Sequence, residues 1–232
     1  MESKETLQTI SSDGVKVTFD YYKSPHINCP ILILCHQAGY SRGEYIETAE
    51  YLTQLGFSCI AIDQRSGNEV NDIKNQTALD AHSKGKSLQY VDAVPDIEAA
   101  IAYADKEFPH AKKVLVGSSY SSSLAIILGV KHAKSLTAVA SFSPGEYFTY
   151  EGNTVAEWAK ELKLPIFITS AKGEVSGWKN IFSNAASETK VGYEPQGNGI
   201  HGSRNLWSST TNHVEYRNAF ESFLESLNLF EF

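Results

Sequence analysis

The sequence predicts an α/β protein with a doubly wound, mostly parallel sheet and helices on both faces. Two observations lead to this fold class. Short apolar runs, such as residues 30–35, alternate along the chain with longer segments of helical periodicity, such as residues 213–227. The runs are continuously apolar, which is typical of strands buried on both faces of a parallel sheet. Ligands of such sheets bind beyond the carboxyl ends of the strands, so chemistry is expected there.

The N-terminal half is expected to form three strands and two helices. The strands are residues 15–22, 30–35 and 57–62, and the helices are residues 43–55 and 88–108. The first of these strands alternates polar and apolar residues, which indicates an edge hairpin strand. Gly56 fits a C-cap of the first helix, and the second helix is expected to begin near Pro95, since proline suits a first turn.

The C-terminal half continues the same alternation. The expected strands are residues 113–117, 136–142, 165–170 and 190–193, and the expected helices follow Gly117 directly and span residues 213–227. We treat residues 1–232 as one domain. The long polar segment 65–89 is expected to be irregular, and a loop of this length is usually functional or disordered. Both a lid over the site and a solvated insertion fit it.

Composition excludes several classes of partner. The chain has 232 residues, 42% of them hydrophobic, and a net charge of −7 without a basic block. This argues against a nucleic acid or an anionic membrane surface as partner. No stretch approaches the ~18 apolar residues of a membrane span. No cysteine or histidine spacing indicates a metal site, and no cofactor is implied.

Cysteine usage bears on the compartment. The chain has three cysteines, and two of them, Cys35 and Cys59, fall in expected buried strands. They fit core thiols in a reducing compartment, which favours a cytoplasmic protein. The first residues have no signal-peptide character, although a trimmed export signal would leave the same sequence.

The most informative motif is Gly-Ser-Ser-Tyr-Ser at residues 117–121. A strand that turns sharply into a helix holds its central residue in a strained conformation, and the residues two before and two after it must be small. Ser119 meets this condition through Gly117 and Ser121, whereas Ser118 does not. The alternative is a loop with an N-cap serine. The motif indicates Ser119 as a nucleophile.

A serine nucleophile needs a base, and the base needs a carboxylate. His201 lies in a glycine-rich loop after the last expected strand, which suits the base. Two glutamates follow expected strands, Glu174 and Glu146, and either gives the chain order serine, acid, histidine. We favour Glu174 as the acid and keep Glu146 as the alternative.

Acyl transfer also needs two N–H donors for the forming oxyanion. The backbone N–H of Tyr120 follows the nucleophile and is the first donor. The second is expected in the loop after the strand at residues 30–35, with Ala38 as first choice and Gln37 as alternative. His36 would then anchor this loop and would not be the base.

These motifs together resemble the α/β-hydrolases, and within them the dienelactone-hydrolase-like and small serine esterase group. The resemblance covers almost the whole chain and implies that fold, a serine nucleophile and no cofactor. The chain departs from the family pattern at three positions, which are Gln37 for glycine, Ser121 for glycine, and Gly173 with Glu174 beside it where aspartate is common. Dienelactone hydrolases proper use a cysteine nucleophile, so their substrate does not transfer to this chain.

Aromatic and basic residues lie near the motifs in sequence. The aromatic residues fit either a substrate pocket or core packing, and they are Tyr40, Tyr120, Tyr147, Phe148, Tyr150, Trp178 and Trp207. One cation could pair with a substrate carboxylate, and the candidates are Arg42, Arg65, Lys172 and Arg204.

The sequence therefore predicts a serine hydrolase that cleaves small-molecule carboxylic esters through an acyl-serine intermediate. A peptidase or a carbon–carbon hydrolase on the same fold is the first alternative. The second is a non-catalytic ligand-binding protein that keeps the scaffold, because fold alone does not imply activity. The natural substrate and the oligomeric state do not follow from the sequence.

Overall fold

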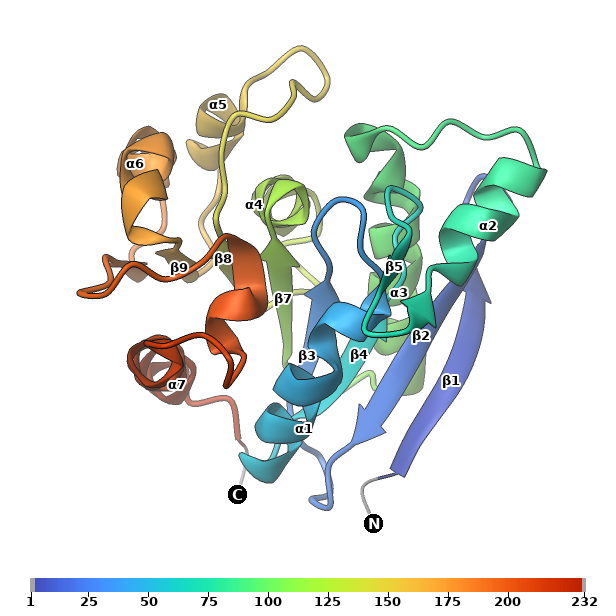
Figure 1. Cartoon of the computed structure of the whole chain (residues 1–232), viewed down its shortest axis with the longest axis horizontal. Helices are drawn as coiled ribbons and strands as arrows, with labels where there is room; N and C mark the ends of the chain where they lie inside the picture. Colours follow the sequence, from blue (N-terminus) through green and yellow to red (C-terminus); the bar gives the residue numbers. More distant parts are fainter. Residues whose placement is uncertain (1–2, 231–232) are drawn as a thin grey trace. The chain divides into compact units, whose positions relative to one another are not determined.

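A computed structural model describes residues 3–230, and the chain divides into two compact units, Met1–Val114 and Leu115–Phe232. Strands flanked by helices make up both units (Figure 1). The strands form a mostly parallel sheet, as the sequence predicts.

The first unit holds four long strands, a short hairpin and three α-helices. They are β1 (Ser3–Ile10), β2 (Lys16–Lys23), β3 (Ile31–Cys35), α1 (Ile46–Gln54), β4 (Ser58–Ile62), β5 (Glu69–Val70), β6 (Ile73–Lys74), α2 (Gln76–Ser83) and α3 (Val94–Glu107). The long strands lie in the order β1-β2-β4-β3, with β3 and β4 parallel. Helix α3 has Pro95 in its first turn, as expected.

The two faces of β2 pack against different elements. On one face Phe19 lies 4.7 Å from the ring of Tyr103 in α3, centroid to centroid. Helix α2 packs beside the start of the same strand, since the Thr18 N–H donates to Thr77 Oγ1 at 3.0 Å. In Figure 1, α1 lies in front of the first unit's strands and α3 lies behind them, as a doubly wound sheet requires.

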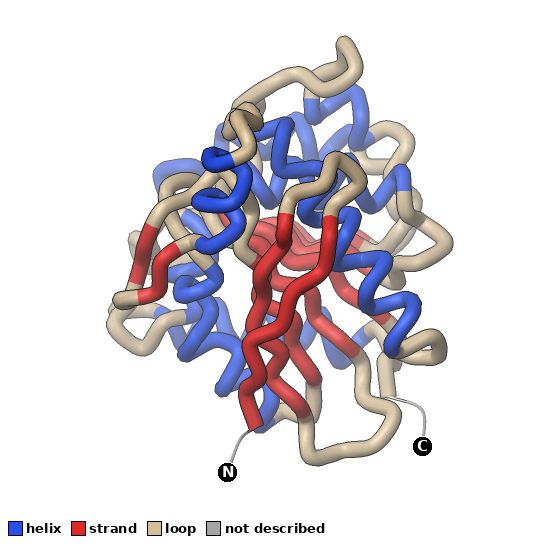
Figure 2. Tube along the Cα trace, turned by 90° about the vertical axis from the view of Figure 1, so that its right-hand side faces the viewer, coloured by secondary structure: helices blue, strands red, loops and turns tan. Residues whose placement is uncertain are grey.

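The N-terminal hairpin differs from the prediction. The strand expected at residues 15–22 is β2, but it is not an edge strand, because it pairs with β1 on one side and β4 on the other. Figure 2 shows β1 and β2 as two long antiparallel strands that begin at the N-terminus. The edge strand β1 was missed because its sequence, SKETLQTI, is mostly polar and lacks an apolar face.

The segment 65–89 is not irregular, contrary to expectation. It contains the β5–β6 hairpin and helix α2. The Asn75 side chain caps α2 by accepting from the Ala78 N–H at 2.8 Å. The helix was missed because its buried positions carry small residues, Thr77, Ala78 and Ala81, which give a weak apolar pattern. The interpretation of this segment as a lid stays a prediction.

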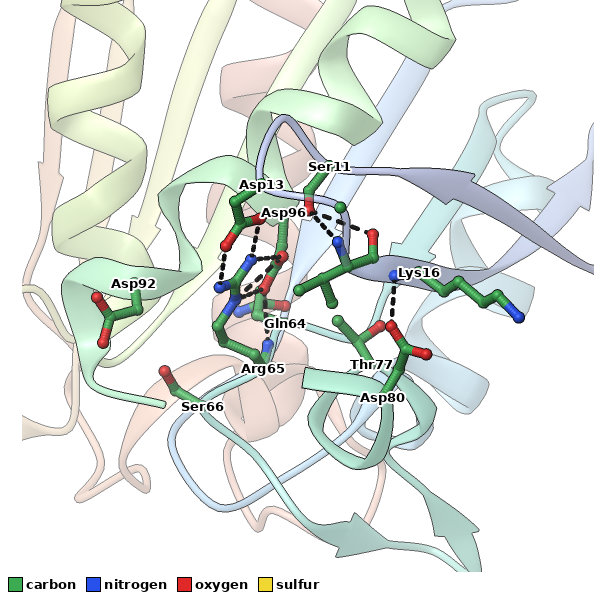
Figure 3. A network of polar contacts seen from close by, with 12 residues as sticks. Ser11, Asp13, Lys16, Gln64, Arg65, Ser66, Thr77, Asp80, Asp92 and Asp96 are labelled. Atoms are coloured by element: carbon green, nitrogen blue, oxygen red, sulfur yellow. Dashed lines mark hydrogen bonds and ion pairs between the residues drawn. The ribbon is translucent and has the colours of Figure 1, made fainter. Parts of the chain in front are cut away.

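A buried ion-pair network joins distant parts of the first unit. Arg65 donates to both oxygens of Asp13, at 2.7 and 2.9 Å, and to both oxygens of Asp96 in α3 (Figure 3). The Arg65 side chain is 3% exposed, and that of Asp96 is fully buried. The guanidinium therefore ties the β1–β2 turn to α3.

The second unit holds four strands and four α-helices. They are β7 (Lys113–Ser118), α4 (Tyr120–Lys131), β8 (Ala138–Phe142), α5 (Val155–Ala159), β9 (Ile166–Thr169), α6 (Val175–Asn184), β10 (Lys190–Tyr193) and α7 (His213–Ser226). The strand order is β7-β8-β9-β10, and β9 is parallel to both β8 and β10. The sequence analysis anticipated all of these elements except α5 and α6.

Strand β8 shows how this unit is layered. A Cβ on Gly129 of α4 would lie 2.7 Å from Val139, so α4 packs closely on one face of the strand. On the other face, the ring of Phe142 lies 5.4 Å from that of Phe220 in α7. The loops that follow β7, β8, β9 and β10 carry Ser119, Ser143, Glu174 and His201 respectively.

Candidate active site

Ser119 lies at the junction of β7 and α4, in a strained backbone conformation. Its φ is +59° and its ψ is −126°, a region that non-glycine residues rarely adopt. The Ser119 N–H donates to the carbonyl of Phe142 in β8 at 2.8 Å, which holds the turn in place. The structure thus shows the sharp strand-to-helix turn that the sequence predicts.

The small residues around Ser119 have identifiable physical reasons. A Cβ at Gly117 would lie 2.4 Å from the carbonyl oxygen of Ser121, so only glycine fits there. The Ser121 Oγ donates to the Ser118 carbonyl and accepts from the Ser118 N–H, both at 2.9 Å. The serine that stands in place of the family's usual glycine therefore closes the turn with its own hydroxyl.

His201 contacts both Ser119 and Glu174. Its Nε2 lies 2.7 Å from Ser119 Oγ, and its Nδ1 lies 2.5 Å from Glu174 Oε1. Because an ionised carboxylate only accepts, Nδ1 carries the proton and Nε2 is left to accept from the serine hydroxyl. This tautomer is the one that a general base requires.

The loop that carries His201 is held by backbone hydrogen bonds. It continues into a 3-10 helix, η4 (Gly202–Leu206), whose first two N–H groups donate to Ser143 Oγ and Ser118 Oγ at 2.8 and 2.9 Å. A Cβ on Gly199 would collide with the Tyr216 hydroxyl, and φ there is +63°, so glycine is required. The imidazole therefore sits on a fixed loop.

Glu174 ends the short 3-10 helix η3 (Lys172–Glu174) that follows β9. Its Oε2 accepts from Ser143 Oγ at 2.8 Å and from the Ala171 N–H at 3.2 Å. Burial raises the pKa of the carboxyl, but hydrogen bonds from His201 and Ser143 outweigh it, so the net pKa lies below the usual value. Glu174 is therefore ionised at neutral pH.

Glu146, the alternative acid, lies elsewhere in the second unit. Its two carboxylate oxygens accept from the N–H groups of Val155 and Ala156 at 2.7 and 2.8 Å. These are the first two residues of α5, so Glu146 caps that helix. The sequence favoured Glu174 but left Glu146 open, because each glutamate follows a strand in the same chain order.

The expected oxyanion donors lie in different units. The Tyr120 N–H is the first amide of α4, directly after Ser119. In the first unit, the Gln37 N–H already donates to Glu44 Oε2 at 2.7 Å, which argues against Gln37 as a donor. Among residues 3–230, the Ala38 N–H makes no hydrogen bond. The pairing of Tyr120 with Ala38 stays a prediction.

His36 anchors the loop that contains Ala38, as expected. It donates from Nδ1 to the Gln37 carbonyl at 2.8 Å and accepts at Nε2 from the Gln64 N–H at 2.9 Å. Burial lowers the pKa of this imidazole to about 4, although hydrogen bonds to Gln37 and Gln64 act in the opposite direction. The ring is therefore neutral, and both of its nitrogens form hydrogen bonds.

Several residues considered for the substrate pocket have other roles. Arg65 forms ion pairs with Asp13 and Asp96, and Arg42 forms ion pairs with Asp20 and Asp63. Trp178 is 2% exposed and donates to Ser170 Oγ at 2.7 Å, so it is a core residue. The sequence missed the two arginine roles because their acidic partners lie more than 20 positions away, whereas core packing was one of the two interpretations of Trp178.

Residues 3–230 contain no cluster of three or more His, Cys, Asp or Glu side chains placed to hold a metal ion. Within the same residues, no helix is both long and apolar enough to cross a membrane. The three cysteines are free thiols.

The fold and this arrangement define the class of protein, a serine hydrolase with the α/β-hydrolase fold. The chain belongs to the family described as serine aminopeptidase, S33 (Hydrolase_4), whose model matches residues 27–187. The matched residues include Ser119 and Glu174, whereas His201 lies beyond them. No curated protein sequence matches the chain.

Solved structures share the fold over nearly the whole chain. The esterase Pf2001 of Pyrococcus furiosus has a TM-score of 0.74 at 15% identity, covering 97% of this chain and 93% of its own. A dienelactone hydrolase from Anabaena variabilis has a TM-score of 0.74 at 12% identity, covering 97% and 98%. A carboxyl esterase from Bacillus coagulans has a TM-score of 0.71 at 13% identity, covering 98% and 99%.

Proposed function

We propose that this serine hydrolase cleaves small-molecule carboxylic esters through an acyl-serine intermediate. The observation that carries the proposal is the hydrogen-bonded chain from Ser119 Oγ to His201 Nε2 and from His201 Nδ1 to Glu174 Oε1. Nucleophile, base and orienting acid lie within hydrogen-bond distance of one another, which a non-catalytic scaffold would not need.

The reaction proceeds in two halves. His201 takes the Ser119 proton as Oγ attacks the carbonyl carbon, and Glu174 stabilises the imidazolium that forms. The N–H of Tyr120, next to Ser119, donates to the oxyanion, and Ala38 stays the predicted second donor. The tetrahedral species collapses, the alcohol leaves with the proton from His201, and Ser119 keeps the acyl group. Water, deprotonated by His201, then releases the acid and restores the serine.

Esters are favoured over the alternatives by the structural relatives, which include two esterases. The family description names an aminopeptidase, so peptide bonds are the main competing substrate class. The dienelactone hydrolase among the similar structures gives no support to carbon–carbon cleavage, because a lactone is a cyclic ester. Three free thiols, two of them fully buried, fit the reducing cytoplasm that we propose as its compartment.

The test is fluorophosphonate labelling of the wild type, Ser119→Ala and Ser123→Ala, with the modified peptide mapped by mass spectrometry. Ser123 is the matched control, because its buried hydroxyl bonds to the Gly145 backbone and lies one turn along the same helix. Labelling at Ser119 that persists in Ser123→Ala and vanishes in Ser119→Ala is expected. Absent labelling of folded wild type would overturn the proposal.

A substrate panel then separates the reaction classes. Short-chain and aromatic p-nitrophenyl esters are compared with aminoacyl p-nitroanilides and with a diketone. We expect turnover of the esters to exceed that of the other two. A kcat/KM for an aminoacyl anilide above that of every ester would move the assignment to a peptidase.

A further inference from the structure

Ser143 connects the loop of the acid to the loop of the base. Its hydroxyl donates to Glu174 Oε2 at 2.8 Å and accepts from the Gly202 N–H, next to His201, also at 2.8 Å. The residue is 1% exposed and follows β8, between the strands whose loops carry Ser119 and Glu174. One side chain therefore touches two otherwise separate loops of the site.

The direction of these two hydrogen bonds is fixed. A backbone N–H can only donate, so the bond from Gly202 occupies a lone pair on Ser143 Oγ. The single hydroxyl proton is then left for the carboxylate of Glu174. This hydrogen bond to the ionised form holds Oε2 and leaves Oε1 to face His201.

The backbone at Ser143 gives a second, independent reason to assign a role to the side chain. Its φ is +60°, a conformation that glycine adopts most easily and that strains other residues. The Ser143 N–H donates to the Thr169 carbonyl at 2.7 Å, and the Tyr147 hydroxyl donates to the Ser143 carbonyl at 2.7 Å. Glycine would adopt this backbone conformation with less strain. The presence of serine therefore indicates that its hydroxyl group makes interactions that compensate for the strained backbone.

We propose that Ser143 is a positioning residue for the reaction, which orients the Glu174 carboxylate toward His201 and fixes the His201 loop beside it. The proposal rests on the proposed function, because it assigns a role within the same site. Ser143 does not touch the reacting atoms and acts only through Glu174 and the Gly202 N–H.

The surroundings of Glu174 define what a pH profile reports. The titratable groups that bear on its carboxyl are His201, which donates to it, and Tyr216 of α7. Without the Ser143 hydrogen bond, the carboxylate is no longer held against His201 Nδ1 and stabilises the imidazolium less. The acid limb of the kcat/KM profile is therefore expected to move to lower pH.

The experiment compares Ser143→Ala with Ser143→Gly. Both lack the hydroxyl, but glycine relieves the positive φ while alanine keeps it, so the glycine variant is expected to be the more stable of the two. Despite this difference in stability, kcat for an ester should fall by about 10- to 100-fold in both variants, because each loses roughly one charge-assisted hydrogen bond. KM should change little. Both should also show the shifted acid limb.

Ser141→Ala is the matched control, since Ser141 is a buried serine of β8 whose hydroxyl donates to the Ser122 carbonyl and does not reach Glu174. Its kcat and acid limb should match the wild type. A folded Ser143→Gly with wild-type kcat and an unmoved acid limb would overturn the role of Ser143 while wild-type labelling at Ser119 still supports the proposed function. If the folded wild type is not labelled, both the proposed function and the role of Ser143 are overturned.

Discussion

The carboxylate of Glu174 accepts a hydrogen bond from the Nδ1–H of His201, with 2.5 Å between Oε1 and Nδ1. Glu146 follows the neighbouring strand and also lies between the serine and the histidine in the chain. Its carboxylate, however, accepts hydrogen bonds from the first two backbone N–H groups of α5. The two glutamates therefore have separable roles, and each role predicts its own phenotype.

Glu174→Gln should lower kcat by about 10³- to 10⁴-fold, because an amide stabilises the wrong tautomer of His201 and cannot stabilise the imidazolium. Glu146→Gln should leave kcat within about twofold and lower stability by about 1 kcal/mol through the weakened helix cap. Steady-state ester hydrolysis and urea unfolding measure both. A larger kcat loss in Glu146→Gln than in Glu174→Gln would assign the acid to Glu146.

Gly117→Ala should destabilise the turn before Ser119. The added Cβ would lie 2.4 Å from the Ser121 carbonyl oxygen, and backbone atoms on both sides have little room to move. We expect a loss of about 1–3 kcal/mol and slower labelling of Ser119.

Gly177→Ala in α6 is the control for this substitution, since nothing lies within 4 Å of its added Cβ. Alanine favours a helix over glycine by about 1 kcal/mol, so this variant should be as stable as the wild type or more so. Equal stability of the two alanine variants in urea would contradict the close approach at Gly117.

The buried His36 predicts a pH dependence of stability. Its folded pKa is about 4, below the usual value of 6.5, so the unfolded state binds a proton between these pH values and the folded state does not. The free energy of unfolding should therefore rise with pH through this window by about 1.4 kcal/mol per unit from this group. Stability from this source is lost as pH falls from about 6.5 toward 4.

His36→Gln should flatten this slope, and denaturant unfolding at pH 4.5, 5.5 and 6.5 measures it. The variant also loses ring hydrogen bonds, so the slope, and not the stability at one pH, is the readout. His82→Gln, which removes an exposed imidazole, is the control. A slope identical in wild type and His36→Gln would show that folding does not lower the pKa of His36.

Arg65→Ala should act on stability and leave substrate preference alone. It removes the guanidinium from the fully buried carboxyl of Asp96, and breaking a buried pair costs about 3–5 kcal/mol. The double variant Arg65→Met/Asp96→Leu should recover part of this loss, because no unpaired charge stays buried. The ratio of kcat/KM for anionic and neutral esters should not change. A selective loss on anionic esters would instead place Arg65 at the substrate.

The candidate site was largely predictable because its signals are local. Gly117 and Ser121 must be small because the sharp turn at Ser119 brings them close together, and this constraint is visible within five residues. The glycines around His201 likewise indicate a bent loop from neighbouring residues alone. The parts that were missed depend on distant partners. The bonds from Arg65 to Asp13 and Asp96 span 52 and 31 positions, and the bond from Ser143 to Glu174 spans 31.

The secondary structure divides in the same way, into elements with a local sequence signal and elements that depend on distant partners. Apolar runs such as β3 and β4 were found because burial on both faces leaves a continuous pattern. Strand β1 and helix α2 were missed because a polar edge strand and a helix with small buried residues leave almost none. Their places are set by pairing with β2 and by contacts such as that of Thr77 with Thr18.

By itself the sequence determined the α/β fold class, the strained serine between strand and helix, and a histidine loop downstream, since each depends on apolar periodicity or on the size of near neighbours. Only the tertiary structure decided which glutamate faces His201, that Ser143 joins the two loops, and that Arg65 is buried in ion pairs. These outcomes depend on which strand ends lie side by side, and hydrogen bonds of under 3 Å are fixed by that packing and not by distance along the chain.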